Sequence, residues 1–462
     1  MTIDERVSFI TKIKEKRWEG INELVLSLIE ENNFIAVGQK IVDLYIYSNG
    51  LYTKIEKGAI HSMVQQILGV TCTETLRNDI YSTLKASCFK YEGLDIFKTS
   101  LLNFIPLKNG VYDVKTKTLL PHDPKYYFAF QFPVNYDETK TAPTITKFLD
   151  DTFTEAQRLT IEEWIGYIFH RNYMLKKALI IVGEGDTGKT TFLEMITALV
   201  SSSNISSVTL DKMSNDKFAT MQMYNKHVNI YDELSAQDVG DTTAFKMATG
   251  NGNMVGEAKF GDRFQFINFA KLTFACNKIP DVKDVDDEAY FNRWMVIRLE
   301  KTIENKILNF VDRITTEEEI SGLFNIAMRG LERLKEQGHF TYKSSGIDTK
   351  KEMMLGGNSV GQFAMLRLEQ CADNEISKAD MYDTYTSYCI DNSLAAIEIK
   401  TFGKRLQAYV PYIADSIIYD KNSMKGKQVR GWKHVAIKKT QEQQESNQAD
   451  WDSWNNTINI NI

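Results

Sequence analysis

The chain has 462 residues, of which 43% are hydrophobic and 25% are charged, and its formal net charge is -6. This composition excludes a mainly disordered chain, and the negative net charge excludes a uniformly basic coat for nucleic acid. A chain of this length is expected to form several domains with substantial buried cores.

Cysteine usage and apolar runs indicate a soluble protein of a reducing compartment. The five cysteines are scattered, and none forms a C-x-x-C pair or stands at metal-binding spacing with a histidine. The start, MTIDERVSF, lacks a basic stretch followed by an apolar core, so no signal peptide is predicted. No apolar run approaches the ~18 residues of a membrane span. We therefore expect a cytoplasmic protein without a membrane partner.

The first part of the chain, residues 1–144, is expected to be an α+β region that is mainly helical. The alternation around SNG in DLYIYSNGLYTKI predicts a β-hairpin, and IPLKNGVYDVKTKTLLPHDP predicts a second hairpin followed by a loop. From about residue 145, ITKFLDDTFTEAQRLTIEEWIGYIFHR predicts helices that lead into the next strand.

The middle of the chain, residues 145–340, is expected to be a P-loop ATPase core with flanking helices. Between residues 178 and 300, short apolar strands alternate with helices and polar loops, which predicts an α/β fold with a central parallel sheet. EEEISGLFNIAMRGLERLKEQG predicts a later helix that Gly338 ends. We then expect a linker at 341–365, a small domain at 366–440 and an acidic mobile tail at 441–462, whose two tryptophans leave a docking role open.

The strongest motif is IVGEGDTGKTT, which follows the apolar run KALIIV and fits G-x-x-x-x-G-K-[ST]. Its glycines let several backbone N–H groups point at phosphate oxygens, beside the N-terminus of a helix. Lys189 is expected to reach the β- and γ-phosphates, and the Thr190 hydroxyl to ligate Mg²⁺. The predicted ATP-binding residues are Gly183, Glu184, Gly185, Asp186, Thr187, Gly188, Lys189, Thr190 and Thr191.

Two further strands are expected to end in polar groups that act on the same nucleotide. HVNIYDE ends in Asp232, which would hold Mg²⁺ through water, and in Glu233, which would orient the attacking water. An acidic pair on the surface is the alternative interpretation. KLTFACN ends in Asn277, whose amide can contact the γ-phosphate or the attacking water.

An arginine follows in DDEAYFNRW. Arg293 is interpreted as an arginine finger delivered to the site of a neighbouring subunit, with a surface arginine as the alternative. Arg298, further along the same strand, is expected to be structural. This order of parts departs from a small-molecule kinase and indicates an oligomeric ATPase with shared sites.

These segments together resemble a known family. Four segments resemble motifs of superfamily 3 helicases: GEGDTGKTT resembles Walker A, VNIYDE resembles Walker B, KLTFACNKIPDV resembles the sensor motif, and DEAYFNRWMVIRL resembles the arginine-finger motif. Upstream, IPLKNGVYDVKTKTLLPHDPKYYF and IEEWIGYIF resemble the phage and plasmid primase–helicase group, in its D5-like and P4-like branch. Downstream, EISGLFNIAMRGLERLKEQGHF is similar to the helix that follows the ATPase core in that group. The similarity spans roughly residues 40–440.

The resemblance implies an AAA+-type core that forms a hexameric ring and moves 3′ to 5′ on single-stranded DNA. The resemblance also implies that the chain is a close relative of the replication initiators of mobile genetic elements, such as phage-inducible chromosomal islands. The front of the chain lacks a convincing primase set of carboxylates and histidine, so priming is expected from the primase or replisome of the host.

The family also implies a DNA-contacting hairpin, which matches GEAKFGDRFQF. Lys259 and Phe260 would lie near its tip with Arg263 close by, a pairing of cations and an aromatic ring that suits single-strand channels. A solvated hairpin with a packed phenylalanine is the alternative.

The segment from Ala395 to Lys439 contains ten Lys or Arg and three Asp or Glu, an excess of seven positive charges that indicates an anionic partner. ISKADMYDTYTSYCI predicts a helix capped by Ser377, and IKTFGKRLQAYV predicts a second helix with Phe402, Leu406 and Val410 facing inward.

Two strands around a basic turn follow these helices, which predicts a winged helix that binds double-stranded DNA at origin repeats. A basic domain that packs on the ring without reading sequence is the alternative. The predicted DNA contacts are Lys400, Lys404 and Arg405 on the second helix and Lys425, Lys427 and Arg430 on the wing.

Three functions fit these features to different degrees. The first is an ATP-driven DNA helicase that also recognises its own origin. The second is an ATP-dependent DNA-binding regulator or assembly switch that never unwinds. The third, a metabolic P-loop kinase, fits poorly with the Arg293 segment and the basic C-terminal domain.

Overall fold

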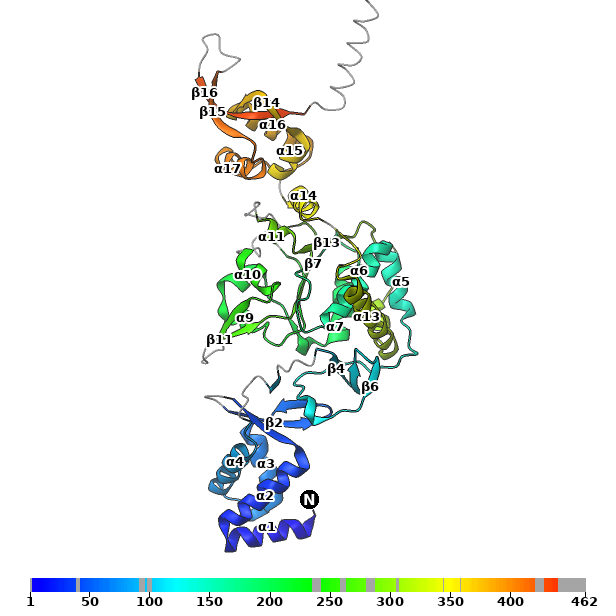
Figure 1. The fold of residues 1–462 in the computed structure, drawn as a ribbon, viewed down its shortest axis with the longest axis vertical. Helices are drawn as coiled ribbons and strands as arrows, with labels where there is room; N and C mark the ends of the chain where they lie inside the picture. The colour runs from blue at the N-terminus through cyan, green and yellow to red at the C-terminus, as the bar shows by residue number, and fades with distance from the viewer. Residues whose placement is uncertain are drawn as a thin grey trace, which may run out of the picture. The chain divides into compact units, whose positions relative to one another are not determined.

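A computed structural model describes residues 2–38, 42–90, 96–97, 102–234, 242–257, 263–279, 287–304, 307–343, 345–357, 359–419 and 428–438 (Figure 1). The backbone forms two compact units, each built from several segments of the sequence. The first contains Met1–Asn172, Thr191–Ile205 and Asn305–Thr341, and the second contains Tyr173–Thr190, Ser206–Glu304 and Tyr342–Ile462. Within the described ranges, the helices are either too short or too polar to cross a membrane.

The first unit begins with four helices and two small antiparallel sheets. Asn49 and Gly50 have φ values of 51° and 89°, as a two-residue hairpin turn requires, so the first predicted hairpin is confirmed. The second predicted hairpin forms β4 and β5. The elements are α1 (Ile3–Glu15), α2 (Arg17–Asn32), β1 (Phe34–Val37), β2 (Asp43–Ser48), β3 (Leu51–Lys54), α3 (Lys57–Leu68), α4 (Glu74–Ser87), β4 (Phe104–Leu107), β5 (Gly110–Asp113) and β6 (Thr118–Leu120).

The rest of the first unit is built around two helices whose backbones touch, α6 (Glu155–Ile168) and α13 (Glu317–Gln337), with α5 (Pro143–Thr152) and α12 (Phe310–Ile314) beside them. A Cβ atom on Gly166 would collide with the backbone of Ala327, and one on Gly330 with the backbone of Glu162. Glycine is therefore required at this helix crossing by the close approach of the two backbones.

A buried polar network closes the same helix pair. Arg333 donates from Nε to Glu163 Oε1 at 2.7 Å and from Nη2 to Glu162 Oε2 at 3.1 Å, and the backbone N–H of Thr341 donates to Glu163 Oε2 at 2.8 Å. These bonds satisfy the fully buried Glu163 carboxylate. Gly338 ends α13 with a φ of 71°, as predicted.

The second unit contains a five-stranded sheet in the order β13-β7-β12-β9-β8. Strands β13, β7, β12 and β9 are paired in parallel, which confirms the predicted α/β class with a central parallel sheet. The strands are β7 (Ala178–Val182), β8 (Ile205–Ser206), β9 (Val228–Tyr231), β12 (Lys271–Cys276) and β13 (Trp294–Arg298).

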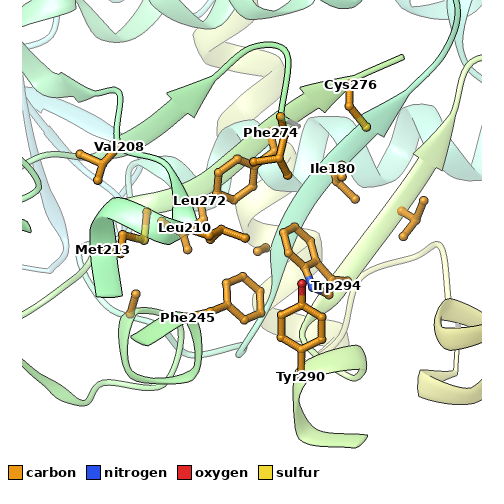
Figure 2. Packing of buried hydrophobic residues seen from close by; sticks show 14 of the residues in the cluster. Ile180, Val208, Leu210, Met213, Phe245, Leu272, Phe274, Cys276, Tyr290 and Trp294 are labelled. Carbon is orange, nitrogen blue, oxygen red and sulfur yellow. The ribbon is translucent and has the colours of Figure 1, made fainter. Parts of the chain in front are cut away.

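One face of this sheet is covered by short helices that share an aromatic core. Figure 2 shows the rings of Phe245, Tyr290 and Trp294 close together. The Phe245 and Trp294 rings stack with their centroids 4.6 Å apart, and the Tyr290 and Trp294 centroids are 5.8 Å apart. This packing fixes α10 and α11 at the start of β13. The elements here are α8 (Leu210–Asn215), α9 (Lys217–Met221), α10 (Thr242–Ala248), β10 (Asn253–Glu257), β11 (Arg263–Ile267) and α11 (Glu288–Phe291).

The C-terminal part of the chain contains helices and a three-stranded antiparallel sheet in the order β14-β16-β15. Ser377 caps its second helix by accepting the backbone N–H of Asp380 at 3.0 Å, as predicted. Phe402, Leu406 and Val410 are buried, which confirms their inward face. The elements are α15 (Ser359–Arg367), β14 (Leu368–Ser377), α16 (Lys378–Asp391), α17 (Ile399–Tyr409), β15 (Ala414–Tyr419) and β16 (Gln428–Ile437).

The structure differs from the predicted linker at 341–365, because α14 (Gly346–Gly357) and most of α15 form there. Met353 joins the core beneath the five-stranded sheet, whereas Val360 and Phe363 join the core of the C-terminal part. Several apolar residues of this polar, glycine-containing segment are thus used in packing, whereas Ile347 is exposed. The predicted acidic tail, 441–462, lies outside the described residues.

Replacing Gly330 with alanine should destabilise the protein by about 1–3 kcal/mol, although alanine favours a helix, because the new methyl group collides with the α6 backbone. Gly58 is the matched control, since it also lies in a helix and a Cβ there would have nothing within 4 Å. Gly58→Ala should be neutral or stabilise by about 0.5 kcal/mol. Thermal unfolding of both variants measures the difference, and equal effects would contradict the close helix crossing.

Candidate active site

Four strand ends meet at one edge of the five-stranded sheet. Val182, the last residue of β7, is in register with Cys276 on β12 and with Arg298 on β13. The pairing continues past the strands, because Gly183 N donates to the Cys276 carbonyl at 3.2 Å and Leu234 N to the Ala275 carbonyl at 2.9 Å. In open α/β sheets, the carboxyl ends of parallel strands form the ligand-binding edge.

The loop after β7 has the geometry of a phosphate-binding loop. Lys189 is buried, with 9% of its surface exposed, and its Nζ donates to the carbonyls of Gly183 at 2.6 Å and Glu184 at 2.7 Å. Gly188 has a φ of 95°, which favours glycine, and α7 (Lys189–Val200) begins directly after it. The loop thus curls around an ammonium group next to a helix N-terminus, where backbone N–H groups attract anions.

The first glycine of the loop is sterically required. A Cβ on Gly183 would lie 2.7 Å from Thr187 Oγ1 and 3.1 Å from the Leu299 carbonyl oxygen. Thr187 Oγ1 itself donates to the Glu184 carbonyl at 2.9 Å, which braces the turn. The remaining predicted ATP-binding positions, from Gly185 to Thr191, follow along the same loop and into α7.

The predicted acidic pair lies directly after β9 at the same edge. Asp232 and Glu233 are both exposed, and Glu233 N donates to Asp232 Oδ1 at 3.0 Å. Glu233 has a φ of 62°, a backbone conformation that a residue with a side chain adopts at a cost of roughly 1–3 kcal/mol and that is found often at functional sites. Asn277 follows β12 and is exposed at the same edge.

The thiol of Cys276 shows how closely the charged groups gather here. Burial raises the pKa of this thiol to about 12, while the charges of Arg298 and Lys189 oppose the rise and Asp232 adds to it. Coulombic effects weaken with distance, so all three ionic side chains lie near the end of β12. Arg298, which the sequence predicted to be structural, therefore also lies near this edge.

The residues at this edge fit a magnesium ion that is shared with phosphate. The described residues contain no group of three or more His, Cys, Asp or Glu side chains that could hold a metal by themselves. Mg²⁺ commonly takes one or two carboxylates together with phosphate oxygens and water. Thr190 and Asp232 supply one hydroxyl and one carboxylate, which is enough for a metal that arrives with a nucleotide.

Arg293 lies at the opposite edge of the sheet. It precedes β13, whose first residue, Trp294, pairs with Ala178, the first residue of β7. The five residues of β13 separate Arg293 from the phosphate-loop edge by about 16 Å, at ~3.3 Å per residue. The structure therefore does not bring Arg293 to the nucleotide site of its own chain.

The local surroundings of Arg293 hold it against α11. Its Nη1 donates to the Ala289 carbonyl at 2.6 Å, and its Nε is buried without a recorded partner in the described part of the chain. Burial lowers the pKa of the guanidinium, and the nearby Asp287 carboxylate opposes this. Asp287 in turn caps α11 and forms an ion pair with Lys246 at 2.6 Å.

The predicted DNA-contacting hairpin is present as the antiparallel pair β10 and β11. Arg263 stands opposite Glu257 across the hairpin, and its Nε donates to Glu257 Oε2 at 2.7 Å. The Arg263 side chain is nevertheless 64% exposed. Lys259 and Phe260 lie outside the described residues.

The basic residues of the C-terminal part are split between a helix and a strand. Lys400 and Lys404 are exposed on α17, on the side away from the buried Phe402, whereas Arg405 is half-buried. Arg430 is exposed on β16. Lys425 and Lys427 lie outside the described residues.

Comparison with known proteins finds relatives for two segments of the chain. Residues 38–154 match the family described as "D5 N terminal like", and residues 181–293 match a family of unknown function, DUF5906. A stretch of 237 residues is 27% identical to "Putative helicase 184R" of Invertebrate iridescent virus 6. This stretch takes in 46% of the chain and spans only 23% of the viral relative.

A comparison with solved structures finds, among others, two apo structures of the NrS-1 C-terminal region. One has a TM-score of 0.49 at 12% identity and the other a TM-score of 0.46 at 15% identity. In both cases the match covers 90% of this chain and 98% of the NrS-1 chain.

The buried thiol of Cys276 offers a test of the site geometry. With its pKa raised to about 12, the thiol should have almost no reactive thiolate at pH 8.5, and its labelling should increase only as the pH approaches 12. The half-buried Cys371 is the internal control. Iodoacetamide labelling of the native protein, read by peptide mass spectrometry, should modify Cys371 first. Equally fast labelling of Cys276 would show that the strand end is open.

Proposed function

We propose that this chain is a superfamily 3 DNA helicase with an AAA+-type core, which couples hydrolysis of Mg²⁺-ATP to unwinding of DNA. In this proposal it is the replication initiator of a mobile genetic element and works as a hexameric ring that moves 3′ to 5′. The observation that carries the proposal is the shared sheet edge, which gathers a phosphate loop, an acidic strand end and a polar strand end. The D5 N terminal like segment and the viral relative named as a helicase support it.

Each group at the edge has a role in ATP hydrolysis. Lys189 contacts the β- and γ-phosphates, and Thr190 and Asp232 hold Mg²⁺. Glu233 orients and activates the attacking water, and Asn277 positions that water or the γ-phosphate. The positive φ of Glu233 fixes its backbone for this task.

The position of Arg293 supports a ring of identical subunits. An arginine about 16 Å from the phosphate-loop edge of its own chain that acts on ATP would act in the site of another chain. The neighbouring subunit would present Arg293 to the transferring phosphate, where such a residue is worth roughly a thousandfold or more in rate. The packed rings of Phe245, Tyr290 and Trp294, next to it in the fold, supply a rigid support.

DNA is proposed to bind at two places. The β10–β11 hairpin, with Lys259, Phe260 and Arg263, contacts single-stranded DNA in the ring. The C-terminal domain acts as a winged helix at origin repeats in double-stranded DNA: α17 presents Lys400, Lys404 and Arg405, and the β15–β16 wing presents Lys425, Lys427 and Arg430.

A second candidate is an ATP-dependent DNA-binding regulator that does not unwind. The bond between Arg263 and Glu257 favours it, because it engages the one described cation of the predicted DNA-contacting hairpin within the hairpin itself. Both candidates require ATP and DNA binding, and they differ in whether DNA is translocated.

Two substitutions should separate ATP binding from hydrolysis. Glu233→Gln should retain ATP binding and lower kcat by about 100- to 10,000-fold, because it removes the base but not the phosphate loop. Lys189→Ala should lose both binding and hydrolysis, because it removes the phosphate-contacting cation. ATP affinity by calorimetry and phosphate release with and without single-stranded DNA measure the two effects. An unaffected rate in Glu233→Gln, or wild-type turnover that DNA does not change, would contradict the proposal.

Mixing variant subunits should reveal whether Arg293 acts across an interface. Rings of Arg293→Ala alone should bind ATP but be inactive. Rings of Lys189→Ala alone should also be inactive. In mixed rings, an Arg293→Ala subunit supplies the phosphate loop and a Lys189→Ala subunit supplies the arginine, so part of the ATPase activity should return. Absence of any rescue, with mixed rings shown to form, would remove Arg293 from this role.

A further inference from the structure

The end of β13 carries an arginine at the nucleotide edge of its own chain. Arg298 is in register with Val182, the residue immediately before the phosphate loop. Along β13, Trp294, Val296 and Arg298 alternate onto the same face of the sheet. Trp294 and Val296 are buried in the core that covers this face of the sheet. Arg298 is the last residue of the strand on the same face, so it lies at the phosphate-loop edge.

The chain after Arg298 stays against the loop. Leu299 N donates to the Val182 carbonyl at 2.8 Å, and Ile303 N donates to the Asp186 carbonyl at 2.9 Å. Residues 299–303 therefore run beside the Gly183–Asp186 turn. The charge of Arg298 also acts on the Cys276 thiol together with those of Lys189 and Asp232, which places all three groups around one strand end.

The Arg298 side chain forms an ion pair with a carboxylate on α14. Its Nε donates to Glu352 Oε1 at 2.6 Å and its Nη2 to the Glu352 carbonyl at 3.4 Å. The Arg298 side chain is 38% exposed and that of Glu352 is 24% exposed. Burial raises the pKa of Glu352, and Arg298 opposes this rise. A partly exposed ion pair of this kind contributes little to stability, so stability alone does not explain a guanidinium at this edge.

We propose that Arg298 binds the triphosphate of ATP in the site of its own chain. This inference rests on the proposed ATPase function. It adds a second arginine to the site, which comes from the subunit that binds the ATP, whereas Arg293 comes from the neighbouring subunit. A guanidinium presents five N–H donors in a planar fork that matches phosphate oxygens, so one carboxylate and one phosphate can share it. Each site would then hold Lys189 and Arg298 from one subunit and Arg293 from its neighbour.

ATP affinity gives the first test, measured by calorimetry in the Glu233→Gln background so that hydrolysis does not interfere. Arg298→Ala should weaken ATP binding about 10- to 100-fold, as expected for loss of a charge-assisted contact, and Arg298→Lys should restore part of it. Glu352→Gln keeps the guanidinium and removes the ion pair, so it should bind ATP with less than a threefold change. If Arg298 only holds α14 in place, Glu352→Gln should reproduce the Arg298→Ala defect, and the proposal fails.

Subunit mixing gives the second test, because it separates the two arginines. Arg298→Ala mixed with Arg293→Ala should regain ATPase activity, since one interface then contains an intact phosphate loop, Arg298 and Arg293. Arg298→Ala mixed with Lys189→Ala should not regain activity, since both defects belong to the same side of the interface. The reverse pattern would assign Arg298 to the neighbouring site and overturn the inference.

The two tests also separate this inference from the proposed function. If Arg298→Ala weakens ATP binding while DNA does not change the ATPase rate of the wild type and no unwinding occurs, the role of Arg298 is supported and the helicase function is rejected. If the wild type unwinds DNA and Arg298→Ala leaves the ATP affinity unchanged, the helicase function is supported and the role of Arg298 is rejected.

Discussion

The parallel pairing of β13, β7, β12 and β9 is the constraint on which the site depends. Parallel strands end on the same side, so a register that aligns Val182 with Cys276 and Arg298 also aligns whatever follows or precedes each strand. Residues that follow the strands lie at one edge of the sheet, where the phosphate loop is. Residues that precede the strands lie at the opposite edge, about one strand length away. Without this register the phosphate loop would be an isolated anion site with no acid, amide or arginine beside it.

The two edges give the ATPase its proposed division of labour. Arg293 directly precedes β13 at the edge opposite the phosphate loop, and Arg298, the last residue of the same strand, lies at the phosphate-loop edge. This strand thus separates the two arginines that are proposed to serve different sites, with the aromatic packing of Trp294 at one end and the ion pair with Glu352 at the other. A subunit that shifted against its neighbour would move Arg293 relative to the phosphates while Arg298 stayed with them.

Local signals in the sequence predicted much of this structure. The Asn49–Gly50 turn, the Ser377 cap and the Gly338 helix end depend on residues close together in the chain, and all three were predictable from residue type alone. The phosphate loop belongs to the same class, because its glycine and lysine spacing is a property of eight consecutive residues.

Features that depend on distant pairing could not be predicted in the same way. The role of Arg298 follows from the pairing of β13 with β7, more than 100 residues earlier in the sequence. The helices at 346–367 were not predicted, because their sequence is rich in polar and glycine residues. Met353 and Phe363 pack into two different cores, which the local sequence does not indicate. The glycine contact between α6 and α13 is likewise invisible until the two helices meet.

Strand displacement on forked DNA measures whether ATP hydrolysis at this edge moves the protein along DNA. Forked DNA substrates with only a 3′ or only a 5′ single-stranded tail would be incubated with ATP and the wild-type protein, beside Lys189→Ala. We expect unwinding by the wild type alone and only from the 3′ tail. Intact ATP hydrolysis and DNA binding with no strand displacement on either substrate would contradict this expectation and favour the regulatory switch.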